Sequence, residues 1–90
     1  MNRIILNGRR MITRDVTHAY LKRKFNFPDY YGRNLDALWD LLSTIAKETE
    51  IIVVNAHCTP EKLGKYGHSL LKVFEDLNEE SGRVKVTFLN

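Results

Sequence analysis

The chain has 90 residues, enough for one domain with a small core and too few for a second domain. With 43% hydrophobic and 28% charged residues, and no apolar run near the ~20 residues that cross a bilayer, the composition excludes disordered and membrane-spanning proteins. The net charge of +3 permits a nucleic-acid partner, although basic residues gather in the first quarter of the chain and acidic residues near its end.

The start of the chain and its cysteine content indicate the compartment. Only three consecutive apolar residues follow Arg3, too few for the core of a secretory signal. Cys58 is the only cysteine, so no intramolecular disulfide can form, as is usual in a reducing environment. We therefore expect a cytoplasmic protein.

Two elements are predicted before Pro28. Residues 3–6 are a short β-favouring apolar run that Asn7-Gly8 ends with a strong turn signal. Thr13 or Asp15 can cap a helix that ends before Pro28. Its predicted apolar stripe consists of Val16, Ala19, Tyr20, Leu21 and Phe25.

The next stretch, residues 28–45, predicts a loop followed by a helix that begins at Leu35 with Asn34 as its cap. The opposite side of this helix carries Asp36 and Asp40 at i and i+4, with Ser43 one step further. Two like charges at this spacing cost ~0.2–0.5 kcal/mol, and Asp40 lies beyond the turn that the helix dipole favours. Local stability therefore gives no reason for Asp40. The apolar stripe consists of Leu35, Leu38, Leu42 and Ile45.

Three aromatic residues accompany these aspartates. Trp39 lies between the two faces of the helix, and Tyr30 and Tyr31 approach its start from the loop. One interpretation is an ordinary core with a solvated acidic face. The other is an acidic and aromatic docking surface for a basic partner, and the residues alone leave both open.

The second half of the chain predicts strands at residues 51–54 and 84–88. The first is an unbroken β-branched run, which suits a central parallel strand buried on both faces. Between them we expect a short helix over residues 59–63 and a longer one from Gly67 or His68, ended by Gly82 in a left-handed cap. The last half of that helix holds Glu75, Asp76, Glu79 and Glu80, which suit either a solvated face or a second docking surface.

The His57-Cys58 pair is the only place where two metal-ligating residue types adjoin. Adjacent residues lack the spacing typical of metal ligands, and the other two histidines are remote in sequence. We expect no metal, cofactor or thiol chemistry.

The order strand, helix, helix, strand, short helix, helix, strand predicts an α/β fold in a single small domain over residues 1–90. Helical connections between strands require parallel pairing, so we expect a three-stranded parallel sheet packed with three to four helices.

The central residues strongly resemble the barstar family, intracellular inhibitors of secreted bacterial ribonucleases of the barnase type. The matching run is Tyr30-Tyr31-Gly32 followed by residues 34–40, Asn-Leu-Asp-Ala-Leu-Trp-Asp, with Pro28 before it and Arg33 as the one interruption. A looser likeness covers the rest of the chain, including Asn7-Gly8 and the final strand. The fold of the family, a three-stranded parallel sheet with packed helices, agrees with the order above.

The resemblance implies a non-enzymatic inhibitor that forms a one-to-one complex and occludes the active site of a ribonuclease. The Asp40 carboxylate would take the place of a substrate phosphate, and Tyr30 would cover the catalytic histidine. Asp76 would be a secondary charged contact. The full set of ribonuclease-binding residues implied is Tyr30, Gly32, Asn34, Leu35, Asp36, Ala37, Trp39, Asp40, Ser43 and Asp76.

Three departures bear on the partner. Arg33 stands where the best-known member of the family is acidic, Thr44 and Ile45 replace a Gly-Trp pair, and the net charge is positive. Because complementary charge sets association rate and partner choice, these changes favour a ribonuclease less basic than barnase.

The competing hypothesis is a small RNA-binding module in which Tyr30, Tyr31 and Trp39 stack on bases. It would use the basic first quarter of the chain, Arg3, Arg9, Arg10, Arg14, Lys22, Arg23 and Lys24. An enzyme is disfavoured, because the sequence has no nucleophile-base pair, phosphate loop or metal-ligand spacing.

Overall fold

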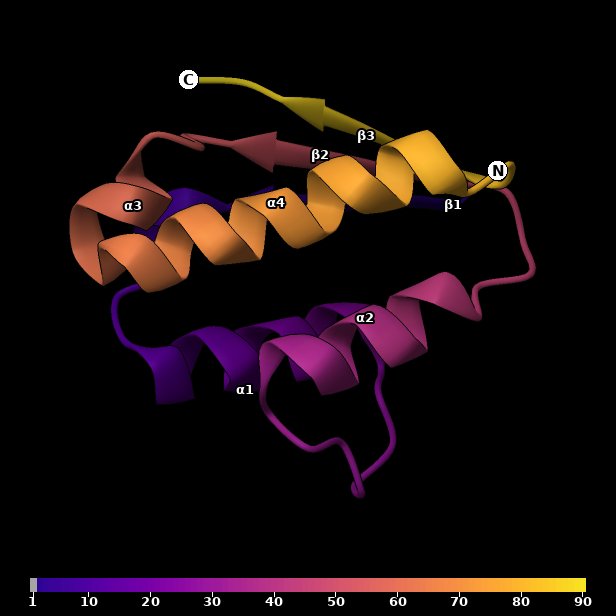
Figure 1. The fold of residues 1–90 in the computed structure, drawn as a ribbon, viewed down its shortest axis with the longest axis horizontal. Coiled ribbons are helices and arrows are strands. Elements are labelled where there is room, and N and C mark those ends of the chain that lie inside the picture. The colour runs from indigo at the N-terminus through magenta and orange to yellow at the C-terminus, as the bar shows by residue number, and fades with distance from the viewer. Residues whose placement is uncertain (1) are drawn as a thin grey trace.

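The computed structural model describes residues 2–90 as an α/β domain with helices packed against a three-stranded parallel sheet (Figure 1), which confirms the predicted fold class. The elements in chain order are β1 (Asn2–Asn7), the 3-10 turn η1 (Gly8–Arg10), α1 (Arg14–Phe25), α2 (Leu35–Ser43), β2 (Thr49–Val54), α3 (Cys58–Leu63), α4 (Lys65–Glu80) and β3 (Val84–Phe88).

The sheet has the order β1-β2-β3, and the predicted central strand is indeed the middle one. Ile51 and Val53 of β2 are fully buried, whereas Ile52 and Val54 are only half-buried. Ile5, which pairs with Ile52, is 47% exposed. The prediction that β2 is buried on both faces is therefore wrong, because the helices cover one face of the sheet and leave the other open.

The longest helix, α4, holds the two halves of the molecule together. It contacts β3 on one side and α2 on another, so it lies between the sheet and α2 (Figure 1). Leu70, Phe74 and Leu77 carry its buried face, as the apolar periodicity predicted. Among residues 2–90, no helix has the length and apolar character that crossing a bilayer requires.

The helix starts follow the predicted capping residues. The Thr13 hydroxyl accepts a hydrogen bond from the Val16 N–H at 3.1 Å, and Asn34 Oδ1 accepts one from the Ala37 N–H at 2.8 Å. The end of α4 differs from the prediction. Ser81, with φ −87° and ψ 132°, takes the chain out of the helix, and no left-handed Gly82 cap forms.

The buried face of α1 also differs from the predicted stripe. Val16 and Ala19 are exposed, whereas Thr17 and His18 are buried together with Tyr20 and Leu21. These two polar residues tolerate burial because their side chains are hydrogen-bonded. The Thr17 hydroxyl donates to the Thr13 carbonyl at 2.6 Å, and both nitrogens of the His18 ring meet tyrosine hydroxyls.

Candidate functional site

The outer face of α2 presents three polar side chains in one row. Asp36, Asp40 and Ser43 are exposed, whereas Leu38 and Leu42 on the inner face are fully buried. The Ser43 hydroxyl donates to the Asp40 carbonyl at 3.1 Å, which satisfies an acceptor near the end of the helix. The buried leucines fix the rotation of α2, so the aspartates point to solvent.

Neither aspartate of this row is neutralised within the part of the chain that the structure describes. The ion pairs found among residues 2–90 are Arg3–Glu50, Lys22–Asp29 and Lys72–Asp76. The carboxylates of Asp36 and Asp40 are thus available to cations from outside the molecule. Charge-assisted hydrogen bonds to such cations are stronger than neutral ones.

The loop before α2 presents one tyrosine and buries the next. Tyr30 is 82% exposed, whereas Tyr31 is 5% exposed and its N–H donates to the Pro28 carbonyl at 3.0 Å. A Cβ atom on Gly32 would lie 3.1 Å from Ala37 Cβ, so the loop packs closely on the first turn of α2. Arg33 adopts the left-handed region with φ 52°, which turns the chain into Asn34 and the helix.

A buried hydrogen-bonded chain ties this loop to the rest of the fold. The Tyr31 hydroxyl lies 2.6 Å from His18 Nδ1, and the Tyr66 hydroxyl bonds His18 Nε2. The Arg14 guanidinium lies 4.1 Å from the centre of the Tyr66 ring, a cation–π geometry. Through His18 the loop is connected to both α1 and the first turn of α4, which restricts the position of Tyr30 beside it.

Burial shifts the pKa values of the three side chains in this hydrogen-bonded chain. Burial lowers the pKa of His18, the charge of Arg33 lowers it further, and the Asp15 carboxylate opposes both. Burial likewise raises the pKa of Tyr31 and of Tyr66, so both hydroxyls keep their protons. A neutral imidazole between two hydroxyls donates from one nitrogen and accepts at the other, and every polar atom is satisfied.

A pocket of about 280 Å³ lies between the loop and α2. Its lining residues are Tyr30, Tyr31, Gly32, Ala37, Asp40 and Leu41. Most of this lining is apolar, and Asp40 contributes the one charged side chain. The pocket can accept a flat ring from a partner, with a carboxylate beside it to bond a ring N–H.

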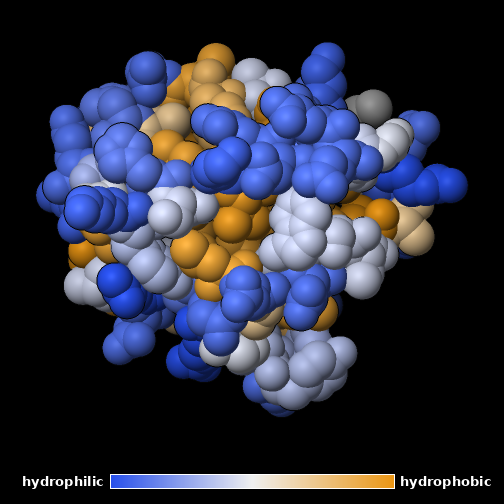
Figure 2. All heavy atoms as spheres, viewed as in Figure 1, coloured by the Kyte–Doolittle hydropathy of each residue, from blue (hydrophilic) through white to orange (hydrophobic). Residues whose placement is uncertain are grey.

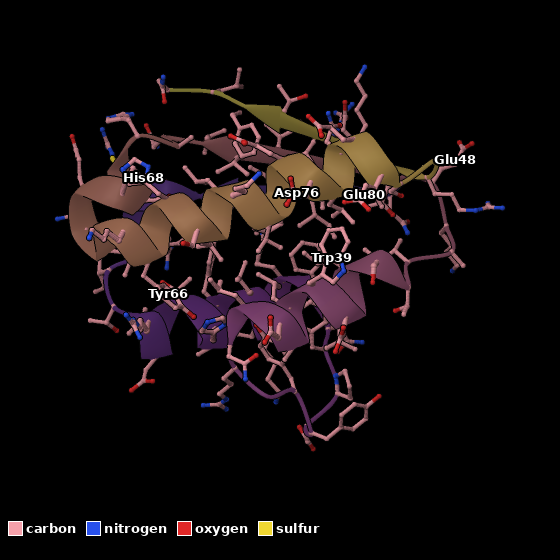
Figure 3. The ribbon with its side chains drawn as sticks, in the orientation of Figure 1. Trp39, Glu48, Tyr66, His68, Asp76 and Glu80 are labelled. Atoms are coloured by element: carbon pink, nitrogen blue, oxygen red, sulfur yellow. The ribbon has the colours of Figure 1, made fainter. Side chains whose placement is uncertain are left out.

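A second hollow, of about 420 Å³, runs between α2 and the end of α4. Trp39 rises from α2 toward α4, with Asp76 and Glu80 on the adjacent stretch of α4 (Figure 3). Figure 2 shows an apolar area between these two helices, surrounded by hydrophilic side chains. The lining residues are Trp39, Ser43, Ile45, Leu77, Glu80, Ser81, Gly82 and Arg83.

The ten predicted contact residues therefore separate into groups. The pocket brings together Tyr30, Gly32, Ala37 and Asp40, and the second hollow brings together Trp39 and Ser43. Asp36 is exposed on the same face of α2, Leu35 is half-buried and Asn34 caps the helix. Asp76 differs from the other acids, because Lys72 Nζ binds its carboxylate at 3.2 Å.

Sequence reasoning missed the residues that shape the site without carrying charge. Leu41 lies outside the apolar stripe predicted for α2, yet it lines the pocket. His18 was considered only as a remote metal ligand. The signal that could have found it is its place three residues before Leu21 and seven before Phe25, spacings that share one face of a helix.

Comparison with known proteins gives two consistent results. The family described as "Barstar (barnase inhibitor)" matches residues 1–89. A protein of Bacillus subtilis (strain 168), named "Putative ribonuclease inhibitor YrdF", is 41% identical over 81 residues, which cover 89% of each chain.

Proposed function

This chain belongs to the barstar family, and we propose that it is a non-enzymatic protein inhibitor of a small secreted bacterial ribonuclease of the barnase type. The inhibitor forms a one-to-one complex that occludes the active site. An enzyme that destroys cellular RNA must be blocked where it is made, so the inhibitor acts in the cytoplasm. The lone Cys58 suits that reducing compartment.

The observation that carries this proposal is that Asp36 and Asp40 have no cationic partner among residues 2–90 and that Asp40 borders an apolar pocket. A ribonuclease holds the phosphate of its substrate with converging cationic groups, which stay in place when RNA is absent. The Asp40 carboxylate, fixed on α2 by Leu38 and Leu42, meets those groups as a phosphate would. It offers no bond that the enzyme can cleave.

The surrounding residues give this anion its orientation and specificity. Tyr30 covers the catalytic histidine of the ribonuclease, whose ring enters the pocket beside Asp40. Asp36 lies one turn before Asp40 and binds further cations at the rim. The remaining predicted contacts fill the groove of the enzyme around this centre, namely Gly32, Asn34, Leu35, Ala37, Trp39, Ser43 and Asp76.

The geometry counts against an RNA-binding module. Stacking on successive bases needs several exposed aromatic faces beside a basic track. Of the three aromatics considered, Tyr31 is buried, and Trp39 is half-buried in a hollow that Glu80 also lines. Only Tyr30 presents a free face, and it adjoins the acidic row of α2.

The test is a titration of small secreted bacterial ribonucleases, chosen to span a range of net charge, with the wild-type protein. We expect one member of the panel to lose activity linearly up to an equimolar amount of inhibitor. Asp40→Ala and Asp40→Asn should both weaken that inhibition, because both remove the charge that replaces the phosphate. Glu48→Gln is the matched control, since Glu48 is exposed on the α2–β2 connection, away from Trp39 (Figure 3).

The outcomes distinguish function from mechanism. Inhibition that survives both Asp40 substitutions would refute the phosphate-mimic mechanism but leave the inhibitor function standing. Salt-dependent binding of single-stranded RNA by the same sample, without inhibition of any ribonuclease, would refute the proposed function itself.

A further inference from the structure

Three side chains with metal-ligating atoms meet where β2 runs into α3. One nitrogen of His57, the sulfur of Cys58 and one carboxylate oxygen of Glu61 lie within 4.8 Å of one another. His57 Nε2 is 3.5 Å from Cys58 Sγ. The sulfur is on a buried residue, whereas His57 and Glu61 are exposed, so the cluster opens to solvent on one side.

The turn that delivers these residues is firmly held. Asn55 has φ 52°, and its side-chain amide donates to Asn7 Oδ1 at 3.0 Å. Its carbonyl accepts the Cys58 N–H at 3.0 Å, and the His57 N–H donates to Asn90 Oδ1 at 3.1 Å. The backbone of the first two ligands is thus fixed from β1 and from the end of the chain. Such preorganisation lowers the entropy lost on binding.

The separation of the Cys58 and His57 ligand atoms fits a tetrahedral metal, and the Glu61 carboxylate lies within 4.8 Å of both on an exposed side chain. Zn²⁺ binds sulfur at ~2.3 Å and imidazole nitrogen at ~2.0–2.1 Å, which puts two such ligands roughly 3.6 Å apart at a tetrahedral angle. The observed 3.5 Å between Cys58 Sγ and His57 Nε2 matches this edge. A mixed sulfur, nitrogen and oxygen set is also the donor chemistry that Zn²⁺ accepts more readily than Mg²⁺ or Ca²⁺.

We propose that His57, Cys58 and Glu61 form a binding site for Zn²⁺, with water in the fourth position. The sequence did not predict this site, because the adjacent His57-Cys58 pair supplies only two ligands. The first turn of α3 brings Glu61, three residues after Cys58, to the same face as the sulfur. The expectation of no metal rested on this pair and on the remoteness of the other two histidines, and it did not include Glu61.

This site is remote from the ribonuclease-binding surface at Trp39. α3 leads into the first turn of α4, whereas Trp39 shares a hollow with residues at the other end of α4. α4 has 16 residues and is therefore roughly 24 Å long. Zn²⁺ at α3 would leave the inhibitory surface free, so the two activities are separable.

The test is a titration of the full chain with Co²⁺ as a spectroscopic substitute for Zn²⁺, in a non-thiol reductant. We expect one equivalent to produce the thiolate-to-cobalt charge-transfer band and the visible bands of a tetrahedral site, and Zn²⁺ to displace both. Cys58→Ser should abolish the charge-transfer band. His57→Asn and Glu61→Gln, both at exposed positions where folding is not at risk, should each weaken Co²⁺ binding at least tenfold.

Glu75→Gln is the control for loss of one exposed carboxylate outside the cluster, and we expect its Co²⁺ affinity to equal that of the wild type. The wild type without a charge-transfer band at saturating Co²⁺ would overturn the proposal. An undiminished band in both His57→Asn and Glu61→Gln would also overturn it, because the cysteine would then bind alone. Ribonuclease inhibition plays no part in this readout, so the result tests the metal site independently of the proposed inhibitor function.

Discussion

Two helices of this protein carry acidic clusters, and their surroundings differ. On α2, Asp36 and Asp40 have no cationic partner among residues 2–90, and Asp40 borders an apolar pocket. On α4, Asp76 is bound by Lys72 of its own helix. The ion pair raises the pKa of Lys72, chiefly through the hydrogen bond that its ammonium donates to the Asp76 carboxylate, so Lys72 stays charged at neutral pH.

The difference ranks the two clusters as candidate docking surfaces by what surrounds their charges. The α4 cluster resembles the solvated face of an ordinary helix, with an i, i+4 pair that offsets part of its repulsion. The α2 row instead stands next to a tyrosine held out in solvent and a loop anchored by buried hydrogen bonds. Only the α2 row combines free charge, apolar area and a fixed position, as centres of binding energy do.

The largest expected effect is the contrast between Asp40→Ala and Asp76→Ala in ribonuclease inhibition. Truncating one member of a desolvated charge pair at an interface costs about 2–5 kcal/mol or more, a range to which the barnase–barstar pair of this same family contributes. We expect Asp40→Ala to raise the inhibition constant by at least about 30-fold, as measured by titration of enzyme activity. Equal losses in the two variants would break the comparison between α2 and α4.

The next effect concerns the two neighbouring tyrosines of the loop. Tyr31→Phe removes the hydroxyl from His18 Nδ1 and leaves a buried polar atom unpaired, which costs about 1–3 kcal/mol of unfolding free energy. Tyr30→Phe is the matched control, since Tyr30 is exposed, and its unfolding free energy should stay at the wild-type value. Urea denaturation measures both, and equal stabilities would show that the hydroxyl of Tyr31 is not part of the anchor.

The sequence predicted those parts of this anchor and fold that depend on local chemistry. The Thr13 and Asn34 caps follow from side chains that bond their own helix, and strand β3 was predicted at its observed bounds because its apolar and polar residues alternate. The face of α1 could not be predicted in this way. Hydropathy favours burial of Val16 over His18, and only tertiary structure brings two tyrosine hydroxyls to the imidazole.

The same limit applies to the candidate site. The row of Asp36 and Asp40 follows from helical spacing, so the sequence alone placed both on one face. The pocket beside Asp40 depends on the approach of the loop to α2, and the free state of these carboxylates depends on where the cations of other elements lie. Neither property is periodic along the chain, so the residues alone left open, for both acidic clusters, whether each is a solvated face or a docking surface.

The pH dependence of stability tests the buried anchor of the loop beside α2, because His18 is part of that anchor. Its pKa in the folded protein is below the ordinary value of 6.5, so the unfolded chain binds the proton more tightly. Stability should be full above pH 6.5 and fall as the pH is lowered toward the folded-state pKa, by at most ~1.4 kcal/mol per pH unit for one proton. When the ring binds a second proton, both of its nitrogens donate, so the tyrosine hydroxyl that had donated to the ring must turn away.

Denaturation of wild type and His18→Gln at a series of pH values measures this contribution. The charged groups around the ring are Arg33 from the loop and Asp15 and Arg14 from α1. The wild type should lose stability as the pH is lowered below 6.5 and His18→Gln should lose less. Parallel curves for the two proteins would assign the loss to other groups.

The smallest expected effect is that of the α4 cluster, and it decides whether that cluster belongs to the interface at all. Asp76→Ala removes a partly exposed ion pair worth at most about 1 kcal/mol to folding, so the protein should remain native. At a rim, a charge acts mainly through long-range attraction, which changes the association rate more than the dissociation rate.

Lys72→Ala should change the association rate in the opposite direction, because it frees the Asp76 carboxylate for the basic enzyme. We therefore expect stopped-flow association at low salt to be slower for Asp76→Ala and faster for Lys72→Ala, with both differences shrinking at high salt. Rates that match the wild type in both variants would leave α4 as a purely structural helix and confine the interface to α2 and its loop.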